Sequence, residues 1–368
     1  MHPPKIIISG GGTGGHVFPA IAIADALKAR QPESRILFVG ALGRMEMDRV
    51  PKAGYEIVGL PIAGLQRRLT TKNLSFPFKL LASLRKARKI VSEFQPQIAV
   101  GVGGYASGPV LRSAASRGVP TLVQEQNSFP GITNRILAKK ATAVCVAYPD
   151  MNKWFPDHKI ILTGNPVRKE VLDFAGKREE AAKAFGLSPD KTTVLVVGGS
   201  LGARTINESV ENLLEMFHAG EFQMIWQTGK HYADRAQNAV RARNLANVVA
   251  TPFIERMDLA YAMADLVVSR AGAMSVSELT LAGKPSILIP SPNVAEDHQT
   301  KNAKALADRD AAVLIPDDAA KRKLPEVLSK ILGDASWRAR LSENAKTLAL
   351  PDAAEKIADE IFKIIRKN

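Results

Sequence analysis

Cysteine and long apolar runs are the two features that this 368-residue sequence has least of. Its single cysteine, Cys145, excludes a framework of disulfides within the chain. It lies in the apolar run 143–147, so we expect a buried thiol rather than a nucleophile. No stretch approaches the roughly 18 apolar residues of a transmembrane helix, and residues 1–12 do not resemble a signal peptide. We therefore expect a protein of the reducing cytoplasm that meets a membrane, if at all, at its surface.

Acidic residues are scarce in the first half of the chain. Residues 1–165 contain 22 Lys and Arg against 9 Asp and Glu, a net charge of +13, whereas residues 166–368 contain 28 against 27. Within the first half, residues 57–92 contain no acid and eight bases: Arg67, Arg68, Lys72, Lys79, Arg85, Lys86, Arg88 and Lys89. Such an imbalance favours an anionic partner for the first half.

The sequence does contain a repeated alternation of short apolar runs and helical spacing. The runs predicted to be buried strands are residues 5–8, 36–39, 57–60, 98–100, 121–123, 143–146, 160–162, 193–197, 222–226, 248–250, 266–268, 286–289 and 312–314. Residues 17–30 show the helical spacing of the segments that separate them. The alternation predicts an α/β protein with doubly wound parallel sheets.

A strand, a glycine loop and a helix open each half of the chain, at residues 10–16 and again at 198–204. This weak repeat, and the length of the chain, predict two Rossmann-like domains that face each other across a cleft. We place the first domain at residues 1–165 and the second at 166–351, because Gly, Asn and Pro interrupt the pattern at the junction. A last helix, at about 352–366, could pack back on the first domain.

The first loop reads Gly10-Gly11-Gly12-Thr13-Gly14-Gly15-His16 and formally matches G-x-G-x-x-G. A dinucleotide enzyme also needs an acid at the end of the second strand, and here that strand reaches Gly40 without one. No Lys-Ser/Thr pair follows the glycines, which excludes a P-loop. The remaining prediction is an anion site at a helix N-terminus. His16 beside it could be a general base or equally a structural histidine.

Two further polar segments follow predicted strands of the first half. Gly101-Val102-Gly103-Gly104-Tyr105 is a second candidate anion loop at the same edge of the sheet, and two such loops side by side suggest a diphosphate substrate. Gln124-Glu125-Gln126-Asn127 fits a ligand-binding crevice, although a solvated loop explains it as well.

The second half offers a strand end, a glycine turn and a helix start at residues 269–278. Its amide groups could hold a leaving diphosphate, and Glu278 could accept a hydrogen bond from a ribose hydroxyl. The run 296–299 could bind sugar hydroxyls, and its lone His298 makes a metal site a poor alternative. We identify no Asp-x-Asp metal motif in the chain, so we expect neither a metal ion nor another cofactor.

Taken together, these motifs resemble glycosyltransferase family 28, and within it the N-acetylglucosaminyltransferases of peptidoglycan synthesis (the MurG family). The matching segments are residues 10–20, 101–105, 125–127, 164–168, 198–204, 273–278 and 298–303. The resemblance implies the GT-B fold, with the active cleft between two Rossmann-like domains. It also implies an inverting hexosyltransferase. Such an enzyme moves GlcNAc from UDP-GlcNAc to the C4 hydroxyl of MurNAc in undecaprenyl-diphospho-MurNAc-pentapeptide (lipid I), and makes the β(1→4)-linked lipid II.

The resemblance also implies a role for each site residue. The glycine loops would approach the diphosphates, through Thr13, Gly14 and Gly15 for donor and acceptor and through Gly103 and Gly104 for the acceptor. The residues implied to contact the UDP-sugar are Asn127, Arg168, Ser200, Ile254, Ala273, Met274, Ser275, Val276, Ser277, Glu278 and Gln299. Of these, Ile254 would lie against the uracil and Gln299 would bind the GlcNAc hydroxyls. The catalytic candidates are His16 as general base, then Glu125 and Tyr105.

The basic segment 65–89 also carries apolar side chains, at Leu65, Leu69, Leu74, Phe76, Phe78, Leu80 and Leu81. Bases interleaved with apolar residues favour an anionic membrane surface, although a solvated helix face is an alternative. No motif for nucleic acid is present. We therefore expect a peripheral protein on the cytoplasmic face of the bacterial inner membrane.

Three other functions fit parts of the sequence. A related GT-B enzyme, such as a UDP-GlcNAc 2-epimerase or a glycolipid glycosyltransferase, would share the donor motifs. A non-catalytic membrane-surface protein would explain the basic segment alone. An oxidoreductase would explain the first glycine loop, but the missing acid near Gly40 disfavours it.

Overall fold

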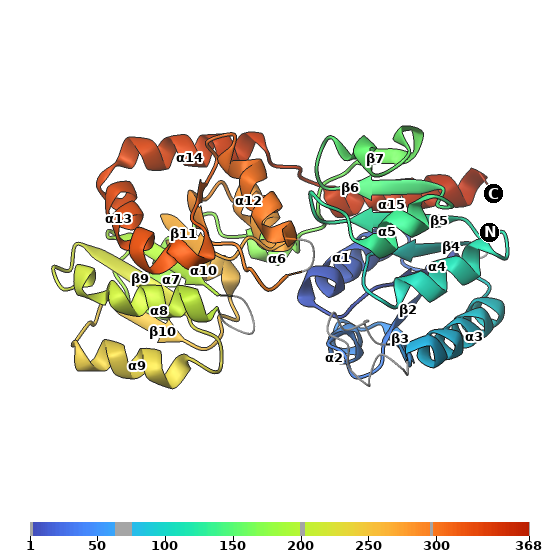
Figure 1. Ribbon diagram of the computed structural model, residues 1–368, viewed down its shortest axis with the longest axis horizontal. Coiled ribbons are helices and arrows are strands. Elements are labelled where there is room, and N and C mark those ends of the chain that lie inside the picture. The colour runs from blue at the N-terminus through green and yellow to red at the C-terminus, as the bar shows by residue number, and fades with distance from the viewer. Residues whose placement is uncertain (1–2, 63–75, 199–202, 295–296, 368) are drawn as a thin grey trace. The chain divides into compact units, whose positions relative to one another are not determined.

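The computed structural model describes residues 3–62, 76–198, 203–294 and 297–367. The chain divides into two compact units (Figure 1). The first comprises Met1–Arg168 and Leu350–Asn368, and the second comprises Lys169–Ala349. Each unit is built on one parallel sheet, which confirms the predicted α/β class.

The sheet of the first unit has the strand order β3-β2-β1-β4-β5-β6-β7. Its strands are β1 (Lys5–Ser9), β2 (Arg35–Ala41), β3 (Glu56–Leu60), β4 (Ile98–Gly101), β5 (Thr121–Glu125), β6 (Ala143–Val146) and β7 (Ile160–Leu162). Ile6 and Ile8 of β1 face one apolar core and Ile7 faces the other, as the alternation of side chains along a strand requires. The strand order reverses between β1 and β4, and ligands of open α/β sheets bind at the carboxyl ends of such strands.

Helices cover both faces of this sheet. One core contains residues of α1 (Gly14–Arg30), α2 (Glu46–Lys52) and α15 (Ala353–Lys367). The other contains residues of α3 (Phe76–Phe94), α4 (Ser107–Ala115) and α5 (Ile132–Ala138). Helix α15, drawn in red in Figure 1, packs on α1 through Ile357, Ile361 and Ile364, which share one face at helical spacing.

The only cysteine, Cys145, lies on β6 with no exposed surface, as predicted. Burial disfavours the charged thiolate and raises the pKa of the Cys145 thiol far above its ordinary value. Such a thiol is inert, which removes Cys145 from the list of possible nucleophiles.

The sheet of the second unit has the order β10-β9-β8-β11-β12-β13. Its strands are β8 (Thr192–Val197), β9 (Phe222–Gln227), β10 (Val248–Thr251), β11 (Leu266–Ser269), β12 (Ser286–Leu288) and β13 (Val313–Leu314). Its helices are α6 (Lys169–Leu172), α7 (Arg178–Phe185), α8 (Arg204–Asn212), α9 (Ala233–Ala242), α10 (Met257–Met263), α11 (Ala273–Leu281), α12 (His298–Ala307), α13 (Ala320–Gly333) and α14 (Ala335–Thr347). Short 3-10 turns complete the two units at Met151–Lys153, Asp157–Lys159, Leu214–Phe217 and Asp317–Ala319.

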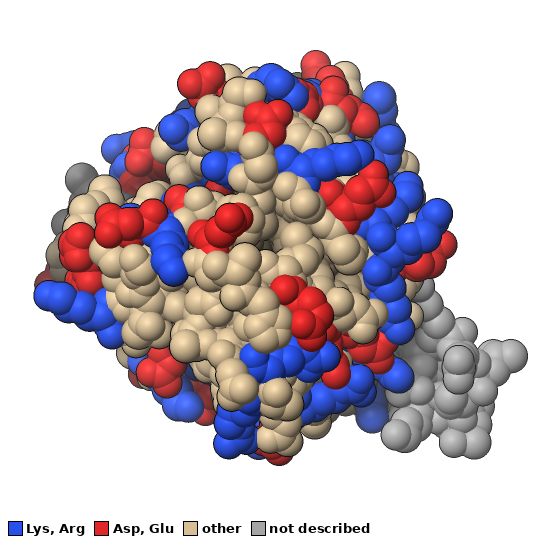
Figure 2. All heavy atoms as spheres, turned by 90° about the vertical axis from the view of Figure 1, so that its left-hand side faces the viewer, with Lys and Arg blue, Asp and Glu red and all other residues tan. Residues whose placement is uncertain are grey.

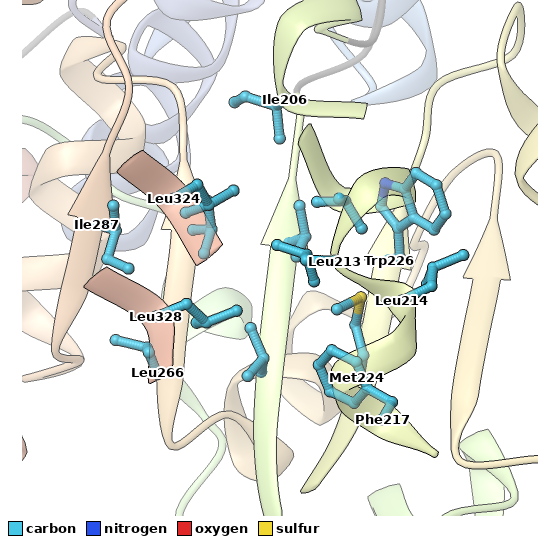
Figure 3. Close-up of a cluster of buried hydrophobic side chains, with 14 of the residues drawn as sticks. Ile206, Leu213, Leu214, Phe217, Met224, Trp226, Leu266, Ile287, Leu324 and Leu328 are labelled. Carbon is cyan, nitrogen blue, oxygen red and sulfur yellow. The ribbon is translucent and has the colours of Figure 1, made fainter. Parts of the chain in front are cut away.

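An aromatic side chain anchors the core of the second unit (Figure 3). Trp226 on β9 is fully buried beside Leu213, Leu214 and Met224. Its indole N–H donates to Oδ1 of Asn207 at 3.0 Å, so the polar group that enters the core with the ring has a partner.

In the described residues, no helix is long and apolar enough to cross a membrane. The face of the molecule in Figure 2, on the side of Figure 1 that carries α9 and α13, mixes Lys and Arg with Asp and Glu. That mixture agrees with the near balance of charge in residues 166–368.

Candidate active site

The two glycine loops of the first unit adjoin at the carboxyl ends of β1 and β4. Gly104 has a φ of +83°, and a Cβ added there would lie 2.4 Å from the carbonyl oxygen of Gly11. A Cβ on Gly10 would lie 2.2 Å from Cγ2 of Val102. Each loop can approach the other only because these positions lack side chains. The sequence-based prediction that the loops lie side by side is therefore confirmed.

A buried carboxylate that sequence reasoning missed holds the first loop. Glu46, at the start of α2, is 1% exposed and accepts hydrogen bonds from the amides of Gly12 at 2.8 Å and Ala41 at 2.9 Å. Gly40 leaves room for it, since a Cβ at Gly40 would lie 2.5 Å from Cγ of Glu46. The acid that a dinucleotide site places at the end of the second strand is thus absent, and an acid from the next helix braces the loop instead.

Because Glu46 occupies the Gly12 amide, that amide is not available to a substrate anion. The amides of Thr13, Gly14 and Gly15 stand at the first turn of α1, where a helix supplies no carbonyl to its own first N–H groups. No acid lies in that turn, and Lys28 and Arg30 lie in the last. The proposed contact of these three residues with a diphosphate remains a prediction that this geometry favours.

His16 lies in the first turn of α1, directly over the second glycine loop. A Cβ on Gly103, whose φ is +93°, would lie 2.9 Å from Cε1 and 3.0 Å from Nδ1 of the His16 ring. The ring also lies beside β5, because Nδ1 of His16 is 3.2 Å from Oε1 of Gln126. His16 is therefore placed where the two glycine loops and the end of β5 meet.

The segment 124–127 is not the solvated loop that was one reading of its sequence. Gln124, Glu125 and Gln126 are 0%, 2% and 1% exposed, and β5 extends through Glu125. The polar residues face the interior at the end of the sheet, where they bond to one another and to the neighbouring loops. The alternative, a ligand-binding crevice at this strand end, stays a prediction.

Glu125 is saturated with donors from its own loop. Its carboxylate accepts from the Asn127 amide at 3.0 Å, the Gly131 amide at 3.2 Å and the side chains of Asn127 and Asn134 at 3.2 and 2.9 Å. Burial raises the pKa of Glu125 above its ordinary value, and the four hydrogen bonds partly offset that rise. This geometry favours a structural role for Glu125 at the start of α5 over a role as base.

Two other predicted residues lie near the glycine loops of the first unit. Tyr105 follows Gly104 directly and is 51% exposed, so its hydroxyl can meet a ligand in solvent. Arg168 is exposed, and its guanidinium stacks on the ring of Phe18 in α1 at 4.5 Å. Phe18 in turn approaches Gly14, which places the Arg168 cation beside the start of α1.

In the second unit, α11 begins after the extended residue Gly272. Ala273 and Val276 are buried in the apolar core, so only their main chain can contact a ligand. Met274, Ser275, Ser277 and Glu278 are half-buried. The Tyr261 hydroxyl donates to Oε2 of Glu278 at 3.1 Å, and burial raises the pKa of Tyr261 well above its ordinary value. This donor keeps Glu278 oriented as an acceptor.

The other residues predicted to contact the UDP-sugar lie elsewhere in the second unit. Ile254 is 4% exposed, so a uracil would meet its backbone rather than its side chain. Gln299, in the first turn of α12, accepts from the Ser291 amide at 2.8 Å, which fixes the direction of its carboxamide. Ser200 and Glu296 lie outside the described residues.

The prediction that the chain has no Asp-x-Asp motif is wrong, because one such triplet occurs at Asp308-Arg309-Asp310 in the turn after α12. Oδ1 of Asp308 lies 3.5 Å from Nζ of Lys304, and Oδ2 of Asp310 lies 2.7 Å from Nε of Arg340. Both carboxylates are therefore paired with cations. Among the residues that the structure describes, no cluster of three or more His, Cys, Asp or Glu side chains could hold a metal ion.

Part of the predicted basic segment forms α3, and residues 65–75 of it lie outside the described residues. Lys79, Arg85, Arg88 and Lys89 are exposed on α3, as is Phe78 at 76%. Residues of α3, α4 and α5 also line an open pocket of about 640 Å³. Its lining is apolar at Leu80, Leu84, Leu111 and Ile136 and cationic at Arg88, Arg112, Lys139 and Lys140.

The chain has two doubly wound units, each with a glycine turn between a strand end and a helix, which is the architecture of the GT-B fold. Residues 6–146 match the glycosyltransferase family 28 N-terminal domain, and residues 193–357 match the family 28 C-terminal domain. The chain belongs to glycosyltransferase family 28.

Curated relatives match the chain over its full length. A protein of Parabacteroides distasonis is 57% identical over 368 residues, which is all of both chains. One of Bacteroides fragilis is 54% identical over 366 residues, covering 99% of this chain and 96% of its own. Both are named UDP-N-acetylglucosamine–N-acetylmuramyl-(pentapeptide) pyrophosphoryl-undecaprenol N-acetylglucosamine transferase.

Solved structures agree with this family. The crystal structure of Acinetobacter baumannii MurG has a TM-score of 0.78 and 28% identity, covering 98% of this chain and all of its own. A UDP-GlcNAc 2-epimerase from Neisseria meningitidis has a TM-score of 0.69 over 98% of this chain and all of its own, at 12% identity. The second likeness is one of fold alone.

Proposed function

We propose that this protein transfers N-acetylglucosamine from UDP-GlcNAc to the C4 hydroxyl of the MurNAc in undecaprenyl-diphospho-MurNAc-pentapeptide. The observation that carries the proposal is the full-length match, at 57% identity, to a relative named for this transfer. The paired glycine loops, with His16 over them, support it independently, because a lipid-linked diphosphate needs an anion site beside the reacting hydroxyl.

The reaction is a displacement at the anomeric carbon of GlcNAc. The C4 oxygen of the acceptor forms the new bond as the bond to the UDP oxygen breaks, and the carbon inverts. His16 takes the proton from the C4 hydroxyl through a ring nitrogen. The negative charge that develops on UDP is stabilised by the amides at the start of α11, and no step requires a metal ion.

The proposed reaction predicts that UDP release depends on the acceptor. Incubation with UDP-GlcNAc and a short-chain lipid I analogue should release one UDP for each disaccharide formed, and omission of the analogue should stop the release. UDP can be followed with a coupled enzyme assay, and the disaccharide by mass spectrometry.

The alternative, a UDP-GlcNAc 2-epimerase, would share the donor motifs and is similar in fold, as the N. meningitidis enzyme shows. Conversion of UDP-GlcNAc to its 2-epimer without acceptor would contradict the proposed transfer. A non-catalytic protein would bind no UDP-GlcNAc in a calorimetric titration.

We also propose that α3 places the first unit on an anionic membrane surface, at the cytoplasmic face of the inner membrane where a lipid-linked acceptor would be reached. Exposed bases and the exposed Phe78 share this helix, and Glu93 in its last turn is the only acid in it. A basic surface with protruding apolar side chains gains both electrostatic attraction and apolar burial at such a membrane.

Reversal of the charges on α3 should release the protein from anionic vesicles. Arg85, Arg88 and Lys89 suit the test, whereas Lys86 does not, because its ammonium donates to the Gly59 carbonyl at 2.8 Å. At roughly 1 kcal/mol per base, changing all three to Glu should weaken binding by about 100-fold or more at low salt. Co-sedimentation with phosphatidylglycerol vesicles measures this.

The matched control changes three bases of the second unit to Glu: Arg241, Arg322 and Lys323. These residues are exposed and carry the same total charge as the three on α3. Equal loss of binding in both triple variants would mean that net charge, and not the α3 surface, attracts the vesicles.

A further inference from the structure

Three buried amide side chains form a line of hydrogen bonds that ends at His16. Asn165, Gln124 and Gln126 are 2%, 0% and 1% exposed. Nε2 of Gln124 donates to Oδ1 of Asn165 at 3.2 Å, Nε2 of Gln126 donates to Oε1 of Gln124, and Oε1 of Gln126 lies 3.2 Å from Nδ1 of His16. The line joins the end of β7, the end of β5 and the first turn of α1.

Two backbone carbonyls fix the direction of this line. Nε2 of Gln126 lies 2.7 Å from the Val102 carbonyl, and Nδ2 of Asn165 lies 2.9 Å from the Gln126 carbonyl. A carbonyl oxygen only accepts, so each carboxamide must present its nitrogen to that carbonyl. Gln126 therefore turns its oxygen toward His16, and Asn165 turns its oxygen toward Gln124.

The direction of the Gln126 carboxamide also determines the tautomer of His16. The carboxamide oxygen of Gln126 has no proton to donate, so Nδ1 of a neutral His16 must carry the proton of this hydrogen bond. Nε2 is then the ring nitrogen with the lone pair. We propose that Gln126 is a positioning residue that holds His16 in the Nδ1–H tautomer, and that Gln124 and Asn165 hold Gln126.

The consequence for catalysis rests on the proposed function. A general base needs its lone pair on the nitrogen that faces the acceptor hydroxyl, and a partner on the other nitrogen selects that tautomer. Gly103 leaves room for the ring in this position, since a Cβ there would lie 2.9 Å from Cε1 of His16. The neutral amide line sets the proton position without adding a charge to the site.

The first test measures the tautomer directly and needs no activity. With 15N-histidine, the six histidines give separate ring-nitrogen signals, and the His16→Ala variant identifies those of His16. In the unsubstituted protein at neutral pH we expect a protonated-type shift for Nδ1 and an unprotonated-type shift for Nε2. The opposite assignment would overturn the proposal.

The second test uses two substitutions at one position. Gln126→Met keeps the length of the side chain but has no acceptor, so the His16 signals should move toward a mixture of tautomers. The kcat should fall by about 10- to 100-fold, a part of what a general base contributes, while KM for UDP-GlcNAc changes by less than about 2-fold. An unchanged tautomer in Gln126→Met would contradict the proposal.

Gln126→Glu keeps an oxygen beside Nδ1 and should retain the Nδ1–H tautomer. Its carboxylate also stabilises the imidazolium, so the acid limb of the pH profile of kcat should move to higher pH. Loss of the tautomer in Gln126→Glu would count against the proposal. If the unsubstituted protein shows the expected Nδ1–H tautomer but the His16→Ala variant turns over normally, His16 is not the base. The tautomer assignment would stand in that case.

Discussion

Replacement of His16 by alanine is expected to lower kcat by about 10²- to 10⁴-fold, which is the usual contribution of a general base. The ring lies where both glycine loops and β5 meet, so its loss removes the group that we propose takes the proton from the attacking hydroxyl. KM for UDP-GlcNAc should change little, because the base acts on the acceptor. Steady-state kinetics with a lipid I analogue measure both constants.

Tyr105→Phe is the matched control for this experiment. Tyr105 is half-exposed beside Gly104. Its replacement by phenylalanine removes one hydroxyl and keeps the ring and the loop. We expect kcat to fall by no more than about 10-fold if the hydroxyl only contacts the acceptor, since one such hydrogen bond contributes about 0.5–1.5 kcal/mol. Near-normal turnover in His16→Ala, with a large loss in Tyr105→Phe, would exchange the roles of the two residues.

Gly104→Ala is expected to be the most damaging small substitution in the first unit. The residue has a φ of +83°, which costs a non-glycine residue roughly 1–2 kcal/mol. Its Cβ would also lie 2.4 Å from the Gly11 carbonyl, a backbone atom that moves only with the loop. We expect the free energy of unfolding of this unit to fall by about 2–4 kcal/mol and kcat to fall at least 10-fold, by overpacking and displacement of the loops.

Gly118→Ala separates these two effects. Gly118 has a similar φ of +75° but lies in an exposed turn with nothing within 4 Å of an added Cβ. The Gly118→Ala variant should lose about 1 kcal/mol of its free energy of unfolding, which is the cost of the backbone conformation alone, and it should keep its activity. Hydrogen exchange of the amides on β1 and β4 reports the stability of the first unit in both variants. Equal losses in Gly104→Ala and Gly118→Ala would mean that the contact between the glycine loops is unimportant.

The strands and the loops that end them could be predicted from the sequence, because their signals are local. Apolar runs such as 5–8 and 193–197 can bury both faces of a strand only inside a parallel sheet. Glycines at the ends of these runs indicate turns. The adjacency of the glycine loops followed from the same topology, since the two loops follow neighbouring strands.

Glu46 could not be predicted, because its role depends on where α2 folds back. Nothing in the local sequence distinguishes it from an exposed helix-initiating acid. The one available signal was Gly40. A glycine at this position leaves room for a buried side chain nearby, and that side chain is Glu46. The amide line was equally hidden, since Asn165 lies 41 residues from Gln124 and only the sheet brings them together.

The configuration of the product tests the central claim most directly. Transfer from UDP-GlcNAc labelled with 13C at the anomeric carbon can be followed by NMR of the lipid-linked disaccharide that forms. We expect a β(1→4)-linked GlcNAc–MurNAc unit, formed with one equivalent of UDP and only in the presence of the lipid-linked acceptor. An α-linked product, or turnover of UDP-GlcNAc that leaves the acceptor unchanged, would contradict it.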